Sequence, residues 1–127
     1  MPDTTAATDD TPDRSPKDIV LSCVRAINQE DFAAARRLVS DDLSFVGVLG
    51  ERHGADAYFK DMQQMRLKYT IRKTVAEGDD VCVLYDLEMS GKTIFVCGWY
   101  HVENGHIKSL RVIFDPRPVL EPSRSKH

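Results

Sequence analysis

The stretch that most constrains the fold covers residues 80–115. It holds three runs rich in Val, Ile, Phe, Tyr and Trp, which are separated by Ser90-Gly91 and Asn104-Gly105. Such dipeptides between apolar runs are typical of tight β-hairpins, because glycine readily adopts the positive φ angles that these turns require. The sequence therefore predicts a three-stranded antiparallel meander.

Three helices are predicted ahead of the meander. Ser15 followed by Pro16 is typical of a helix start, and apolar residues recur at helical spacing across residues 19–27. A second, shorter helix is predicted over residues 31–39, with an aspartate as its cap. Apolar positions near one face of residues 55–67 predict a third helix.

Two further strands are predicted, at residues 43–48 and at residues 68–77, and the first leads into a glycine-flanked loop at residues 50–54. The resulting element order places the helices on one face of the sheet. The sequence therefore predicts an α+β fold: a cone-shaped, curved antiparallel sheet, mixed at its edge, wrapped on about three N-terminal helices.

The length of 127 residues, with 42% hydrophobic content, fits one domain with a core of its own. Residues 1–14 are rich in Asp, Thr and Pro, and we expect them to form a disordered N-terminal tail, because they cannot offset their ordering entropy by burial. The folded domain is expected at residues 15–119, and a polar C-terminal tail at residues 120–127.

The charge pattern argues against nucleic-acid binding. The formal net charge is −3 and the two signs are interspersed, so no basic stripe is available for a phosphate backbone. We expect no nucleic-acid partner.

No apolar run is long enough to span a membrane, and the N-terminus lacks the apolar core of a signal peptide. The sequence therefore predicts a cytoplasmic protein without a membrane partner.

The cysteines and histidines do not form a recognisable site. Cys23, Cys82 and Cys97 lie apart in apolar runs and are predicted to be reduced, buried small side chains. The four histidines lack compact metal-ligand spacing, and no glycine-rich phosphate loop is present. We therefore expect no cofactor.

Pairing across the first hairpin turn gives the meander two apolar faces. One face is predicted to hold Val81, Val83, Tyr85 and Leu87 with Ile94, Val96, Gly98, Tyr100 and Val102. The other is predicted to hold Cys82, Leu84, Asp86 and Glu88 with Phe95, Cys97, Trp99 and His101. A sheet that is apolar on both sides needs two covers, which predicts helices on one side and a homodimer through the outer sheet face.

The orientation of the last strand stays open at this point. The turn at residues 103–105 can hold two or three residues, and a change of one residue reverses the faces of the strand. We expect Leu110, Val112 and Phe114 to point inward, since these three are apolar.

A resemblance to a known family rests on five segments: SPKDIVLSCVRAINQEDFAAARRLVSDDLSF, GADAYFKDM, VCVLYD, WYHVENGHI and RVIFDPRP. Together they resemble SnoaL-like proteins of the nuclear transport factor 2-like superfamily, over residues 15–119. The resemblance implies the cone-shaped fold with a cavity. It does not imply one activity, because the superfamily hosts isomerases, cyclases, hydrolases, dehydratases and non-catalytic modules.

Two catalytic patterns of this superfamily are missing from the sequence. The three polar groups of the ketosteroid isomerases fall on Cys23, Gly47 and a position on or beside Gly98. The final-strand aspartate of the limonene epoxide hydrolases falls on Val112. The resemblance therefore supports the fold more strongly than either reaction.

Candidate site residues are chosen by their chemistry. Asp86 is a carboxylate in an apolar strand, where burial would raise its pKa towards neutrality, and His53 in the loop after the first strand has an imidazole that can move a proton near pH 7. These two are the catalytic candidates. The predicted ligand-binding residues are Phe45, Tyr58, Met62, Tyr85, Tyr100, Val112 and Phe114.

The sequence is compatible with two functions. The first is a SnoaL-like pocket protein that acts without cofactor, as an isomerase, cyclase or hydrolase, on a small, largely apolar or cyclic molecule in the cavity. The alternative is a non-catalytic module of the same fold that binds a hydrophobic ligand or serves dimerisation. The sequence leaves open whether the protein is an enzyme.

Overall fold

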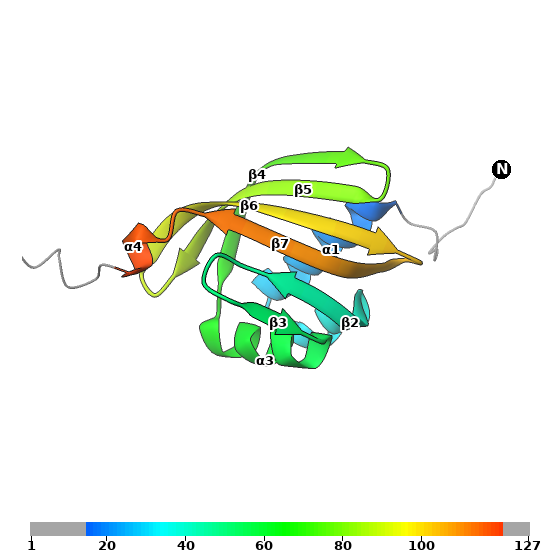
Figure 1. Cartoon of the computed structure of the whole chain (residues 1–127), viewed down its shortest axis with the longest axis horizontal. Coiled ribbons are helices and arrows are strands. Elements are labelled where there is room, and N and C mark those ends of the chain that lie inside the picture. Colours follow the sequence, from blue (N-terminus) through cyan, green and yellow to red (C-terminus); the bar gives the residue numbers. More distant parts are fainter. Residues whose placement is uncertain (1–14, 121–127) are drawn as a thin grey trace, which may run out of the picture.

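The computed structural model describes residues 15–120, so the predictions for residues 1–14 and 121–127 lie outside the described residues. Helices pack against one face of a strongly curved sheet (Figure 1). The helices are α1 (Pro16–Asn28), α2 (Phe32–Arg37), α3 (Ala55–Met65) and α4 (Arg117–Leu120). The strands are β2 (Val39–Val46), β3 (Glu51–His53), β4 (Lys68–Glu77), β5 (Asp80–Met89), β6 (Lys92–Glu103) and β7 (His106–Phe114).

The six strands form one open sheet in the order β3-β2-β7-β6-β5-β4. Strands β2 and β7 run parallel, and every other neighbouring pair runs antiparallel. Four strands and one helix separate β2 from β7 along the chain, which is a long enough connection for the two strands to pair in parallel. The predicted α+β cone with a mixed edge is confirmed.

Helix α1 begins where the sequence predicts. The side chain of Ser15 accepts a hydrogen bond from the backbone N–H of Asp18 at 3.2 Å, and Pro16 occupies the first turn. This cap satisfies one of the free N–H groups at the helix start. The apolar stripe of α1, which includes the fully buried Val20 and Val24, faces the sheet.

Two local predictions between residues 37 and 54 are wrong. The second helix ends at Arg37, because Val39 pairs with Ile107 of β7 and draws the chain into the sheet. The residues after β2 are not all loop: β3 pairs antiparallel with β2, with Arg52 opposite Phe45. Both segments lack a strand pattern of their own and become strands through pairing: Val39 pairs with β7, which is distant in sequence, and β3 pairs with the preceding strand β2.

The meander confirms the predicted registers. Val83 lies opposite Gly98 and Tyr85 opposite Val96, so the predicted inner and outer sets share their faces. In the last strand, a register shift between His101 and Val102 places the apolar residues inward, with Leu110 opposite Tyr100. The inward choice for Leu110, Val112 and Phe114 is therefore confirmed.

The core lies between the helices and the inner face of the sheet, and most of the outer face stays uncovered within residues 15–120. Phe95, Trp99 and Ile113 on that face are 58%, 47% and 57% exposed. Cys23 is buried as predicted, whereas Cys82 and Cys97 are only half-buried because they lie on the outer face. No helix in this part of the chain is long and apolar enough to cross a membrane.

Candidate functional site

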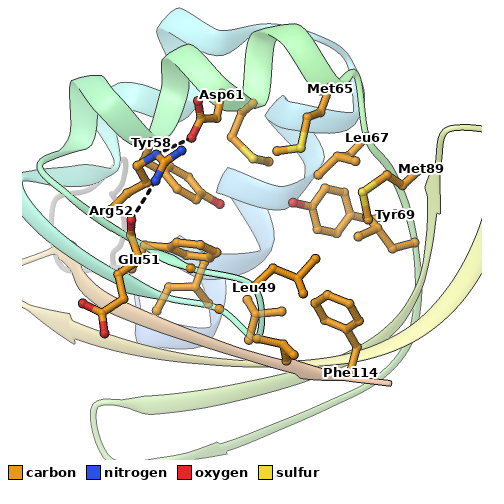
Figure 2. Close-up of a pocket in the computed structure, with 18 of the residues that line it drawn as sticks. Leu49, Glu51, Arg52, Tyr58, Asp61, Met65, Leu67, Tyr69, Met89 and Phe114 are labelled. Carbon is orange, nitrogen blue, oxygen red and sulfur yellow. Dashed lines mark hydrogen bonds and ion pairs between the residues drawn. The ribbon is translucent and has the colours of Figure 1, made fainter. Parts of the chain in front are cut away.

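A cavity of about 250 Å³ opens between helix α3 and the inner face of the sheet. Helix α3, the β2–β3 loop and the strands β4, β5 and β7 supply its walls (Figure 2). Most of the lining is apolar. The lining residues are Phe45, Gly47, Val48, Leu49, Gly50, Glu51, Arg52, Tyr58, Asp61, Met62, Met65, Leu67, Tyr69, Tyr85, Leu87, Met89, Leu110, Val112 and Phe114.

Three tyrosines bring hydroxyl groups to this apolar cavity. Tyr58 comes from α3, Tyr69 from β4 and Tyr85 from β5. The hydroxyls of Tyr58 and Tyr69 point toward each other (Figure 2). The rings of Tyr69 and Tyr85 are in contact, with centroids 4.7 Å apart. The cavity therefore has a polar centre inside an apolar wall.

Burial keeps these phenols neutral. Desolvation raises the pKa of Tyr58 and Tyr69 well above the usual value, and it also raises the pKa of Tyr85. A neutral phenol donates one hydrogen bond and accepts others, but it does not act as a base near pH 7. Within residues 15–120 the Tyr85 hydroxyl has no hydrogen-bond partner, so it is a free donor beside the cavity.

The side chain of Asn28 fixes the position of Tyr69. Its amide nitrogen donates to the backbone carbonyl of Tyr69 at 2.9 Å, and its oxygen accepts from the backbone N–H of Tyr69 at 2.8 Å. This pair of bonds ties the end of α1 to the edge strand β4. The orientation of the Tyr69 ring in the cavity therefore depends on helix α1.

Gly98 makes room for the tyrosines from the opposite strand. A Cβ atom at this position would lie 3.1 Å from Cε1 of Tyr100, and 3.3 Å from Cε1 and 3.4 Å from the hydroxyl oxygen of Tyr85. The first two distances are shorter than ordinary carbon contacts. A glycine at this position leaves room for the rings of Tyr85 and Tyr100.

An ion pair lies at the rim of the cavity. The register of β3 places Arg52 beside Phe45 on the inner face, and its Nε donates to Oδ2 of Asp61 at 2.7 Å (Figure 2). The Nη1 group of Arg52 donates to the backbone carbonyl of Glu51 at 2.9 Å. Both side chains are partly exposed, at 51% for Arg52 and 36% for Asp61.

Apolar side chains that surround the opening are exposed to solvent. Val48, Leu49 and Met65 are 42%, 59% and 43% exposed, and all three line the cavity. Val48 and Leu49 belong to the β2–β3 loop, whereas Met65 ends α3. Exposed apolar groups around a concave opening are typical of a ligand entrance.

Six of the seven predicted ligand-binding residues line the cavity: Phe45, Tyr58, Met62, Tyr85, Val112 and Phe114. Tyr100 does not, because it is buried behind Gly98 at 4% exposure. Ligand binding by these residues stays a prediction.

Asp86, one of the two catalytic candidates, does not point into the cavity. Asp86 alternates with Tyr85 and Leu87 along β5, so its side chain lies on the outer face, opposite Phe95 of β6. There it pairs with Arg72, whose Nη2 is 2.6 Å from its Oδ2. The Asp86 carboxylate is thus on the opposite side of the sheet from the cavity.

His53 also lies away from the cavity. It pairs with Ser44 on the outer side of β3, its side chain is 78% exposed, and its Nε2 is 3.6 Å from Oε1 of Glu51. Neither His53 nor Asp86 lines the cavity. A catalytic role for either residue stays a prediction, and the positions of their side chains do not support it.

Three polar residues of the cavity were not predicted from the sequence. Tyr69 could be found from the alternation in residues 68–77, which places it on the same face as other apolar residues. Arg52 and Asp61 give no such signal, because a strand of three residues and a helix position meet only in the folded chain. Within residues 15–120, no three His, Cys, Asp or Glu side chains converge to hold a metal ion.

The open α+β cone with a cavity between helix and concave sheet defines a class of small pocket proteins. Residues 20–110 match the family described as SnoaL-like domain. The chain therefore belongs to the SnoaL-like family of NTF2-like proteins, which confirms the resemblance seen in the sequence. No curated protein matches the sequence.

Several solved structures are similar to this chain. An NTF2-like protein of unknown function from Cytophaga hutchinsonii ATCC 33406 is 45% identical, with a TM-score of 0.83 over 84% of this chain and 96% of that one. A protein from Kribbella flavida DSM 17836 is 24% identical, with a TM-score of 0.76 over 87% and 97% of the two chains. An LEH-like epoxide hydrolase of M. tuberculosis is 22% identical, with a TM-score of 0.72 over 84% and 86%. The last two similarities show the fold alone.

Proposed function

We propose that the cavity binds a small, largely apolar molecule that carries one carbonyl or ring oxygen, and that tyrosine hydroxyls hold this oxygen. The observation that carries the proposal is the set of buried, neutral hydroxyls of Tyr58, Tyr69 and Tyr85 in an otherwise apolar lining. An apolar pocket with a few converging polar groups is the usual form of a small-molecule site. The cavity volume lies near the lower end of such sites, which favours a ligand of one or two rings.

The tyrosine hydroxyls could also assist a reaction of the bound ligand. Phenol donors that hold a carbonyl oxygen stabilise negative charge that develops on it, as an isomerase, cyclase or hydrolase of this fold requires. A reaction also needs a group that moves a proton. The carboxylate that lines the cavity is that of Asp61, which lies at the rim and is paired with Arg52, whereas the Glu51 carboxylate lies with His53 on the other side of β3.

This distribution of carboxylates favours a second candidate, binding without turnover. No carboxylate or imidazole within residues 15–120 lines the inner part of the cavity, where the hydroxyls lie. In both candidates the oxygen of the ligand occupies the same place. The two candidates differ only in whether a carboxylate at the rim reaches the ligand. The cytoplasmic location of the protein stays a prediction in both.

The experiment compares two molecules of the same shape, indanone and indane, which differ in the carbonyl oxygen. We expect indanone to bind about two- to tenfold more tightly in NMR titrations, the range expected for one net hydrogen bond. Tyr69→Phe or Tyr85→Phe should remove this preference and leave the binding of indane unchanged.

Tyr100→Phe is the matched control for this experiment, because it removes a buried hydroxyl that does not line the cavity. It should keep the preference for indanone. Equal affinity of the wild-type protein for indanone and indane, or no binding of either, would contradict the proposal.

We also propose that a second copy of the chain covers the outer face of the sheet. The support is the exposed apolar group of Phe95, Trp99 and Ile113, which helices do not cover within residues 15–120. Burying such a patch against a symmetric copy removes apolar surface from water. Arg111, which lies opposite Trp99 and has no ion-pair partner in the described chain, would then be available to a carboxylate of the other copy.

A further inference from the structure

The rim of the cavity has its own polar pattern, separate from the tyrosine centre. Arg52 and Asp61 are joined by one hydrogen bond, from Nε to Oδ2, at 2.7 Å. The second nitrogen used by Arg52, Nη1, donates to the backbone of Glu51. Two of the three guanidinium nitrogens are thus held in place, one by Asp61 and one by the backbone of Glu51.

One donor and one acceptor of the pair stay free. Within residues 15–120, neither Nη2 of Arg52 nor Oδ1 of Asp61 has a hydrogen-bond partner. The two groups belong to side chains that touch each other, so they present a donor and an acceptor close together at the opening. The charge of Asp61 offsets that of Arg52, and the Glu51 carboxylate lies exposed on the same short strand.

We propose that the Arg52–Asp61 pair selects ligands that carry a neutral group able to donate and accept, such as an amide or a hydroxyl, and rejects ligands with a carboxylate at that end. This inference rests on the proposed function, because it describes the outer end of the same ligand whose oxygen meets the tyrosines. The ligand class is then a small ring compound with a carbonyl at its inner end and a neutral polar group at its outer end.

The selection follows from matching hydrogen-bond types. An amide donates to the free oxygen of Asp61 and accepts from Nη2 of Arg52, so both rim groups are satisfied. A carboxylate only accepts, so it leaves the Asp61 oxygen without a donor and brings two negative charges together. The attraction of Arg52 does not offset this repulsion, because Asp61 already neutralises the guanidinium.

The experiment uses two isosteric probes, indanone-5-carboxamide and indanone-5-carboxylate, with indanone as the reference. In NMR titrations of the wild-type protein at neutral pH, we expect the carboxamide to bind about tenfold more tightly than the carboxylate. The two probes have the same shape, so the ratio reports on the charge and donors of the outer group alone.

Three variants test how the preference for the carboxamide depends on the Arg52–Asp61 pair. Asp61→Asn frees the charge of Arg52, so the carboxylate should gain about tenfold relative to the carboxamide. Arg52→Gln removes the cation and leaves the charge of Asp61, so it should weaken the binding of the carboxylate further. Arg52→Lys keeps the charge without the planar donors, and it should retain the Asp61 pairing but lose part of the carboxamide affinity.

Asp56→Asn is the matched control, because it breaks an exposed ion pair of the same helix, with Arg36, away from the cavity. It should leave all three affinities as they are in the wild-type protein. If indanone binds and the carboxamide-to-carboxylate ratio is the same in Asp61→Asn as in the wild type, this inference is wrong and the proposed function stands. If indanone itself does not bind, the proposed function is wrong as well.

Discussion

At the scale of single residues, four buried tyrosines pack closely between the helices and the sheet, and Gly98 lies against two of them. Tyr58, Tyr69, Tyr85 and Tyr100 are all at most 8% exposed, and their hydroxyls lie near enough to raise one another's pKa values. A cluster of this kind leaves little space for rearrangement, since protein interiors are close-packed. Gly98 is the position where that limit is easiest to test.

Gly98→Ala should lower the free energy of unfolding by about 1–2 kcal/mol, because the added methyl group overlaps buried rings that have no room to move. Urea denaturation measures the change. Gly50→Ala is the control, since nothing lies within 4 Å of its added Cβ, and its stability should stay the same or rise slightly. Equal effects of the two substitutions would show that the tyrosines adapt to the methyl group.

A second residue-scale prediction concerns His101 on the outer face. Its Nδ1 is 2.9 Å from Oδ1 of Asp80 and its Nε2 is 3.1 Å from Oε2 of Glu103, and the bond with Asp80 raises the pKa of His101. This stabilisation is fully present below the pKa of an unfolded histidine, about 6.5, and is lost as the pH rises through the raised value. In an NMR titration, Asp80→Asn should move the pKa of His101 down, and an unchanged pKa would contradict the assignment.

The sequence predicts residue orientation better than it predicts which face is functional. Alternation along residues 80–89 places Tyr85 and Asp86 on opposite faces, as observed. It does not show which face the helices cover, because that depends on the packing of residues far apart in the chain. The catalytic candidate Asp86 lies on the face away from the cavity, whereas six of the apolar and aromatic residues named from the sequence line the cavity.

At the scale of elements, one side chain connects helix α1 to the edge strand that carries Tyr69. The amide of Asn28 makes hydrogen bonds at 2.9 Å and 2.8 Å with the backbone of Tyr69, and Asn28 is half-buried. These bonds satisfy one donor and one acceptor that would otherwise be unpaired at the edge of the sheet.

Asn28→Ala should lower the free energy of unfolding by about 2 kcal/mol, because it leaves two partly buried backbone groups without partners. It should also weaken the preference for indanone over indane, since Tyr69 loses its anchor. Gln29→Ala, at the neighbouring exposed position, is the control in both assays and should change neither. A stable variant with an unchanged preference would show that β4 holds Tyr69 without this helix.

Element boundaries differ in how far the sequence determines them. Helix α1 and the meander carry their own signals, namely the Ser15 cap and the two glycine turns, and their ends fall where predicted. Strand β3 carries no such signal: its three residues are exposed and polar, and only pairing with β2 makes them a strand. The rim residue Arg52 could not be predicted for the same reason.

At the scale of the whole molecule, the sheet separates two apolar surfaces with different expected partners. The inner surface is covered by helices and encloses the cavity, while the outer surface exposes Phe95, Trp99 and Ile113. The proposed dimer covers the outer surface and leaves the cavity of each copy open. Ligand binding and dimerisation are therefore expected to be separable by mutation.

Trp99→Glu should shift the protein from dimer to monomer, because it places a charge in the centre of the apolar patch. Sedimentation should give twice the chain mass of 14.3 kDa for the wild type and a value near the single chain for the variant. Met65→Glu adds the same charge to an exposed apolar residue of α3 and should keep the dimer. A wild-type protein that sediments as a monomer at micromolar concentration would contradict the proposed dimer.

The most direct test of the central claim, that tyrosine hydroxyls hold the oxygen of a ligand inside the cavity, is the infrared carbonyl stretch of bound indanone. A carbonyl that accepts hydrogen bonds absorbs at lower frequency than the same carbonyl in a hydrocarbon solvent. We expect the bound probe to show this lower frequency in the wild type and in Tyr100→Phe, and to lose most of the shift in Tyr69→Phe or Tyr85→Phe. A bound carbonyl that absorbs at its hydrocarbon-solvent frequency in the wild-type protein would contradict the account.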